Sequence, residues 1–414
     1  MHDLTKLNWQ QSALDILLNN GKNKNRNINV LHSKSTVYKH DELTLSKEAV
    51  KLQKAQKATN TSKNINIDKS INIDSYFEKA IEHNTLAIAN AGESITSSPE
   101  NSAKYLDYCK VYRQIITDKY TSLVEIAKQK DNPEQYIQQK YFNPACDWFA
   151  SDLTEEERDI GYRNEMSVLK KGTTQGLDFN DSFFRINNIK LSYQEEECAE
   201  VSFHRQMLNN QINNIFQKNN IELEDGENYY LSVNPYDYYI SVEGVNEDKK
   251  HAMEQALNVG DNGKNLWRHI YYCSTRDGAK SGQTNLLSYR KHQTFQDVYE
   301  YTGYKLNELE PANGTYYTSD GKDIKVLIKN AVWKDEDIPN DFREGVVSSI
   351  CNQITEICQY GWDNIADMNL MISGNSQGMH DIKQNIDFGQ GSSYVSKFLN
   401  YSQFKNFRIS VYKL

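Results

Sequence analysis

Long hydrophobic runs are absent from this sequence of 414 residues. Every apolar stretch falls short of the about 18 residues that mark a membrane-spanning helix, so we expect no transmembrane segment. The N-terminal residues Met1–Lys6 lack the basic and then apolar order of a secretory signal peptide. We therefore expect a protein that is cytoplasmic, or exported without a cleavable signal peptide.

Cysteine is also scarce, with 6 in the whole chain, and no two of them form a CxxC pair. The 9 histidines show no HxH or HxxxH spacing, so we predict neither a metal nor a cofactor. A metal site brought together by tertiary structure alone is an alternative that the spacing leaves open. Cys351 and Cys358 share one face of a predicted helix, and we interpret them as small buried hydrophobic side chains rather than a disulfide or a thiol site.

Charge divides the chain into two parts. The formal net charge is −9, but residues 1–63 carry 11 basic against 5 acidic residues, a net +6, which leaves −15 for the remainder. Because the larger part is strongly acidic, we expect no general nucleic-acid binding. The basic part includes the Asn/Lys-rich stretch 19–27, which cannot bury enough apolar surface to fold alone.

We predict that residues 1–74 form a basic, low-complexity N-terminal arm that contacts the acidic remainder or a neighbouring molecule. Within it, the pattern Ile-Asn-Ile-Asp occurs at residues 65–68 and again at 71–74, and its alternation is typical of a strand. The segment Asp41–Leu52 resembles the LSxEAxxL phrase of short flagellar export and anti-sigma proteins. That resemblance favours export without a signal peptide.

Residues 75–225 are predicted to form a helical domain. The patterns Ser75–Glu78 and Thr154–Glu157 are capping boxes, in which a hydroxyl and a glutamate satisfy free amides at a helix start. A stripe of tyrosine and isoleucine at spacings of three and four predicts a long helix that ends at Asn132-Pro133. The predicted helices span residues 75–92, 101–130, 154–171 and 195–217.

Residues 226–414 are predicted to form an α+β domain. Strands at 229–233 and 239–242 flank a turn at Asn234–Asp237, which indicates a hairpin. Further predicted strands are 368–372 and 407–412, and predicted helices are 247–258, 263–273, 293–302, 323–332 and 340–360. In the last helix, we expect Phe342, Val346, Val347 and Ile350 to point inward. The fold class is therefore α+β, predominantly α-helical, with a small, mostly antiparallel sheet in the C-terminal half.

Two short motifs could carry chemistry. Gly374–Gly378 matches the GxSxG of a nucleophile elbow, with Ser376 as the nucleophile, but no histidine follows His380 to complete a triad. Gly260–Asn265 resembles a phosphate loop without its spacing or its terminal Ser/Thr. We interpret the first motif as a loop between elements and the second as a helix cap, and we predict no catalytic residue.

Tyrosines gather around the predicted hairpin. Tyr236, Asp237 and Tyr238, together with Trp333, are candidates for a partner-binding or sugar-stacking surface. The alternative is that these aromatic rings pack against helices.

Several phrases resemble a bacterial family of unknown function from low-GC Gram-positive bacteria. They are Asn132–Glu134 with Lys140–Phe142, Leu153–Arg158, Asn258–Leu266 and Thr302–Leu306. The resemblance covers roughly residues 75–390 and brings no catalytic or binding residue with it.

We therefore expect a non-enzymatic bacterial protein that acts by protein binding or self-assembly through its N-terminal arm. One alternative is a secreted effector or a pesticidal, crystal-forming toxin, because surfaces rich in tyrosine and asparagine suit many polar contacts. Another is a hydrolase that uses Ser376.

Overall fold

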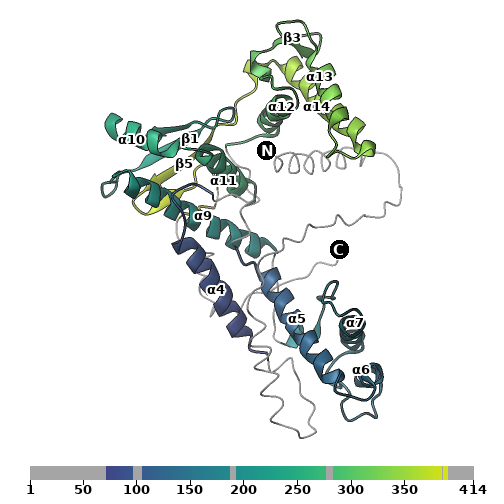
Figure 1. Cartoon of the computed structure of the whole chain (residues 1–414). Coiled ribbons are helices and arrows are strands. Elements are labelled where there is room, and N and C mark those ends of the chain that lie inside the picture. The colour runs from purple at the N-terminus through teal and green to yellow at the C-terminus, as the bar shows by residue number, and fades with distance from the viewer. Residues whose placement is uncertain (1–70, 97–104, 187–192, 277–282, 385, 390–414) are drawn as a thin grey trace. The chain divides into compact units, whose positions relative to one another are not determined.

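The structure is a computed structural model that describes residues 71–96, 105–186, 193–276, 283–384 and 386–389 (Figure 1). These residues belong to two compact units. The helical unit contains the described residues up to Leu223 together with 377–381 and 386–389. The sheet unit contains the described residues of 224–376 and 382–384. Most of the predicted N-terminal arm, and the predicted strand 407–412, lie outside the described residues.

The helical unit consists of α-helices and one short strand, β6 (Gly378–His380). Its helices are α4 (Ile73–Ala89), α5 (Tyr108–Ala127), α6 (Pro133–Phe142), α7 (Glu155–Lys171), α8 (Ser182–Ile186) and α9 (Tyr193–Lys218). The aromatic and aliphatic stripe of α5 faces the core, with Tyr112, Ile116 and Tyr120 buried. The capping box at Thr154 is confirmed, because its hydroxyl and the Glu157 side chain cap each other's amides.

The start of α4 corrects two predictions. The helix begins at Ile73 with Asn72 as its N-cap, so Ser75 lies in the first turn and its hydroxyl donates to the Asn72 carbonyl at 2.8 Å. A capping box at Ser75 and a strand reaching residue 74 are therefore both wrong. The reason is that Ile73 continues the helical spacing of Tyr76 and Phe77, and burial of that face extends the helix.

The role of Asn132-Pro133 differs from the prediction. These two residues were expected to end the long helix, but they lie at the start of helix α6. The preceding helix α5 stops at Ala127, and its predicted start at 101 lies outside the described residues. The Asn132 side chain accepts from the Gln135 amide at 3.1 Å, and Pro133 occupies the first helical position, where its missing N–H costs nothing. The same two residues thus open a new helix.

The sheet unit has the predicted hairpin at its centre. Strand β1 (Tyr229–Val233) pairs antiparallel with β2 (Ile240–Glu243) on one side and β5 (Leu370–Asn375) on the other. Helix α10 (Glu247–Leu257) packs on β2, and α11 (Asn262–Arg276) packs on β1 and β5 (Figure 1). The Trp267 indole of α11 donates to the Met368 carbonyl at 3.2 Å just before β5, which fixes the helix to this sheet.

Three helices of the sheet unit share a second apolar core. They are α12 (Leu286–Thr302), α13 (Ile324–Lys334) and α14 (Asn340–Tyr360), with the hairpin of β3 (Glu310–Ala312) and β4 (Thr315–Tyr317) and the 3-10 turns η3 (Leu306–Glu308) and η4 (Trp362–Asn364). Cys351 and Cys358 are free thiols, half-buried against this core. Phe342 was expected to point inward, but it is 50% exposed in the first turn of α14. In the same turn Arg343 donates to the Trp333 carbonyl at 3.0 Å, so a polar contact rather than Phe342 joins the start of α14 to the end of α13.

The fold is thus α+β and predominantly helical, with its antiparallel sheets in the C-terminal half, as predicted. Among the described residues, every helix is too short or too polar to cross a membrane.

Candidate functional site

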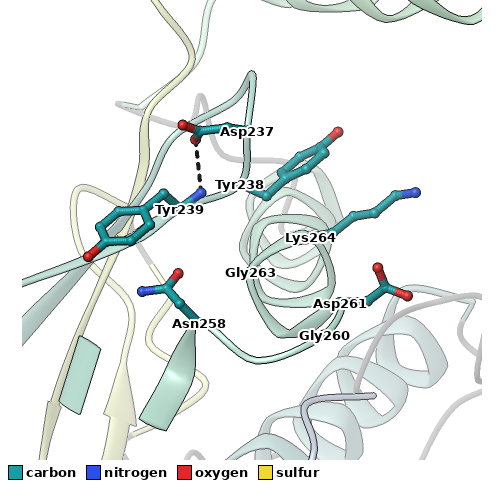
Figure 2. Close-up of a pocket in the computed structure, with 8 residues that line it drawn as sticks. All are labelled: Asp237, Tyr238, Tyr239, Asn258, Gly260, Asp261, Gly263 and Lys264. Carbon is teal, nitrogen blue, oxygen red and sulfur yellow. Dashed lines mark hydrogen bonds between the residues drawn. The ribbon is translucent and has the colours of Figure 1, made fainter. Parts of the chain in front are cut away.

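A polar pocket opens in the sheet unit between the β1–β2 turn and the loop that joins α10 to α11. Eight residues line it: Asp237, Tyr238, Tyr239, Asn258, Gly260, Asp261, Gly263 and Lys264 (Figure 2). Its volume of about 290 Å³ is at the lower limit of the roughly 300–1,000 Å³ typical of small-molecule sites. The pocket therefore suits one or two amino-acid side chains better than a nucleotide.

The β1–β2 turn is held by its own polar side chains. The Asn234 side chain accepts from the Tyr236 amide at 2.8 Å, and the Asp237 carboxylate accepts from the Tyr239 amide at 3.0 Å. Tyr238 adopts a left-handed conformation with φ of 58°, which is costly for a bulky residue. These bonds leave Asp237 and Tyr239 exposed at the surface, whereas the half-buried Tyr238 ring packs against Trp267.

Two glycines allow α11 to approach this turn. Gly260 has a φ of +57°, which reverses the chain after α10. A Cβ atom on Gly263 would lie 1.8 Å from the Tyr238 carbonyl oxygen, so only glycine fits there. The glycines of Gly260–Asn265 therefore serve chain packing, which supports our interpretation of this segment as a helix start rather than a phosphate loop.

Asn258 closes the wall of the pocket between α10 and β2. Its amide group donates to the Ile240 carbonyl at 2.8 Å, and its side-chain oxygen accepts from the Ile240 amide at 2.7 Å. Because both polar ends are occupied, this side chain supports the pocket rather than offering groups to a ligand. Figure 2 shows Tyr239 beside it, on the side of the pocket opposite Tyr238 and Lys264.

The charge of the rim comes from two exposed carboxylates and one lysine. Within the described part of the chain, the Asp261 carboxylate makes no hydrogen bond or ion pair, and Asp237 uses one oxygen for the Tyr239 amide. The Tyr239 ring is 47% exposed, and its hydroxyl reaches Glu254 at 3.4 Å. The half-buried Lys264 is the only basic residue among the lining residues, so the rim is net acidic.

The four predicted partner-binding residues have different positions. Asp237 and Tyr238 line the pocket. Tyr236 is half-buried, packs on Phe295 and Trp362, and donates its hydroxyl to Asp367. Trp333 is 45% exposed at the end of α13, outside the pocket lining.

The sequence indicates Tyr239 only as one of the tyrosines around the hairpin, and Asn258, Asp261 and Lys264 only as members of the family phrase Asn258–Leu266, the last two also within the phosphate-loop resemblance. None of these four lining residues is predicted as a site residue. A signal for the pocket exists in the sequence: an exposed polar turn follows one strand, and a Gly-Asp-Asn-Gly loop precedes the helix that packs on that strand. This signal is not sufficient, because no local pattern in the sequence shows that the turn and the loop are in contact.

Catalytic chemistry finds little support in the geometry. The GxSxG motif joins strand β5 to strand β6 through a two-residue turn at Ser376, whereas a nucleophile elbow joins a strand to a helix. His269 lies 3.5 Å from the Cys273 thiol, but both side chains are fully buried on α11. Within the described residues, no group of three His, Cys, Asp or Glu side chains could hold a metal ion.

The helical unit contains buried charged groups that the sequence analysis also missed. Lys119 pairs with Asp181 at 2.5 Å and Lys140 with Glu165 at 2.9 Å, and Tyr141 donates to Glu165 at 2.8 Å. Burial raises the pKa of Tyr141 well above its usual value, so its phenol stays neutral and donates. Each carboxylate has its own lysine, which is the pattern of a structural ion pair.

Comparison with known proteins identifies the family of this chain, but the matching family and protein carry no assigned activity. "Uncharacterized protein YbdO" of Bacillus subtilis (strain 168) is 29% identical over 311 residues, which cover 75% of this chain and 77% of that protein. No solved structure matches. Residues 67–399 match the family described as "Domain of unknown function (DUF4885)". This range agrees with the resemblance seen over residues 75–390, and because it spans most of the sequence, the chain belongs to that family.

Proposed function

We propose that this chain is a non-enzymatic binding protein whose sheet unit binds a lysine or arginine side chain of a polypeptide partner. The observation that carries the proposal is the net acidic rim of the pocket, which two exposed carboxylates and an exposed tyrosine ring line together. Carboxylates form charge-assisted hydrogen bonds with ammonium and guanidinium groups, and an aromatic face adds a cation–π attraction.

A basic side chain of a polypeptide fits the pocket better than an anionic ligand does. The first turn of α11 and Lys264 favour negative charge, but Asp237 and Asp261 oppose it. Each exposed ion pair contributes only about 0.2–1 kcal/mol, so one side chain alone binds weakly. A partner that places several basic residues along the rim would gain from each of them.

The structure does not affect the functional alternatives predicted from the sequence equally. Binding to another protein and self-association both agree with a surface pocket for a basic side chain. An exported effector or crystal-forming toxin stays a prediction from composition. The hydrolase alternative loses its structural context, because Ser376 lies in a turn between two strands.

The test uses a fluorescent nonapeptide in which lysine and serine alternate, with fluorescence anisotropy as the readout. We expect Asp237→Asn and Asp261→Asn each to weaken binding by about threefold or more, since each removes one charge from the rim. Asn at 237 keeps the oxygen that accepts from the Tyr239 amide, so the turn stays intact.

Asp225→Asn is the matched control, because Asp225 is an exposed acid of the same unit that is not part of the pocket lining. It should leave the affinity unchanged, and a nonapeptide with glutamate in place of lysine should not bind. If the Asp237→Asn, Asp261→Asn double variant binds the lysine peptide as tightly as the unchanged chain does, the pocket is not the binding site.

A further inference from the structure

We infer that the N-terminal arm of the same chain is an internal ligand of the pocket, with Lys22, Lys24 and Arg26 as the groups that engage its rim. The inference rests on the proposed function, because it assigns an occupant to that site. It makes the pocket self-regulated: a partner has to displace the arm before it can bind.

Charge complementarity is the first argument. Residues 1–63 carry a net +6 and the remainder −15, so the arm is attracted to the acidic part of its own chain. On that part, the pocket offers Asp261, whose carboxylate has no hydrogen bond or ion pair within the described residues. Neighbouring lysines on α10 are already paired, as Lys249 is with Glu227 at 2.5 Å.

The spacing of the basic residues is the second argument. In the stretch 19–27, basic residues alternate with asparagine at positions 22, 24 and 26. In an extended chain, alternate side chains lie on the same side and about 6.5–7 Å apart. All three cations would then face the same surface, so that more than one can contact the rim at a time.

Chain length is the third argument. Residues 27–70 separate these cations from the start of the described structure at Ile71. At about 3.3 Å per residue, a segment of this length can reach on the order of 100 Å, so length does not limit docking. A ligand tethered in this way has an effective concentration of about 1 mM, far above the micromolar concentration of a second copy. Docking within one chain is therefore favoured over docking between copies.

The test compares two full-length variants that lose the same charge from the arm. The first is Lys22→Gln, Lys24→Gln, Arg26→Gln, and its matched control is Lys54→Gln, Lys57→Gln, Lys63→Gln. The probe is the alternating lysine–serine nonapeptide. We expect the first variant to bind it at least about threefold more tightly than the unchanged chain, because the fraction of open pockets rises. The control should bind as the unchanged chain does.

Three further results are expected if the arm acts within its own chain. The gain should be independent of protein concentration, it should vanish when Asp237→Asn and Asp261→Asn are added, and it should disappear near 1 M salt, where the Debye length is about 3 Å.

Other results overturn the inference. Equal affinity of the first variant and the unchanged chain would show that the arm does not occupy the pocket, while peptide binding, and with it the proposed function, would stand. An equal gain in both variants would show that general charge, not residues 22–26, is responsible. A gain that depends on protein concentration would place the arm on a second copy. If the peptide binds none of the proteins, the proposed function itself fails.

Discussion

His292 of α12 shows at the scale of one residue how burial sets a protonation state next to the pocket. It is 6% exposed, its ring centre lies 4.3 Å from that of Trp267, and it is hydrogen-bonded to the backbone of Pro235. Burial lowers its pKa to about 4, and the bond to Pro235 opposes this shift only in part. The folded protein therefore holds this histidine neutral at neutral pH.

From this shift we predict a loss of stability in weak acid. In the unfolded chain this histidine has a pKa of about 6.5. Between that pH and about 4, the unfolded state therefore binds a proton at this side chain and the folded state does not. The contribution is complete above pH 6.5 and is lost as the pH falls from about 6.5 to about 4. Its maximum is on the order of 3 kcal/mol.

The variant His292→Gln isolates this contribution, because glutamine does not titrate. Urea unfolding of both proteins between pH 7 and pH 4.5 should show the unchanged chain losing stability relative to the variant as the pH falls. A difference in unfolding free energy that stays constant over this range would contradict the prediction.

The first turn of α11 is the element on which the pocket depends. Gly263 lies within that turn, and its Cα faces the Tyr238 carbonyl of the β1–β2 turn. Glycine inside a helix costs about 1 kcal/mol relative to alanine. Helix propensity alone therefore predicts that alanine at this position stabilises the protein, whereas the close approach predicts the opposite.

We predict that Gly263→Ala destabilises the protein by about 1–3 kcal/mol, since the added Cβ would lie 1.8 Å from an oxygen and must push α11 away. Binding of the lysine–serine nonapeptide should weaken with it. Thermal unfolding and anisotropy measure the two effects. Gly92→Ala is the control, because no atom lies within 4 Å of its added Cβ. If Gly263→Ala is as stable as the unchanged chain, the close approach of α11 to the β1–β2 turn does not require glycine, and the prediction is wrong.

At the scale of the whole molecule, each unit has its own apolar core. Ile116 is fully buried in the helical unit and Ile328 in the sheet unit. Of the described tryptophans, three belong to the sheet unit and only Trp148 to the helical unit. Tryptophan fluorescence thus reports mainly on the sheet unit, whereas far-ultraviolet circular dichroism reports on helices of both.

We predict that Ile328→Ala, at a cost of about 2–5 kcal/mol, lowers the urea midpoint seen by fluorescence more than the midpoint seen by circular dichroism. Ile116→Ala should do the reverse. Chains with separate cores need not unfold in one step. If either variant moves both midpoints equally, the two units unfold as one.

Most of the helices and strands, with their ends, can be predicted from local patterns in the sequence. The predicted 229–233 and 340–360 are β1 and α14, because apolar spacing, N-caps and helix-ending glycines act over a few residues. The β3–β4 hairpin was not predicted, because its strands of three residues are too short to show the alternation of apolar and polar residues. The start of α4 was not predicted either, since the packing of the partly buried Ile73 against the helical core outweighed a capping pattern.

The choice of polar residues that form the candidate site depends on how distant segments pack together. Asp237 and Asp261 are far apart in the chain, and they share a pocket because Gly263 lets α11 pack against the β1–β2 turn. Tyr236 and Tyr239 are alike in sequence, yet one packs against Trp362 and the other is exposed. Local patterns cannot separate such residues, because burial depends on contacts between segments that are distant in sequence.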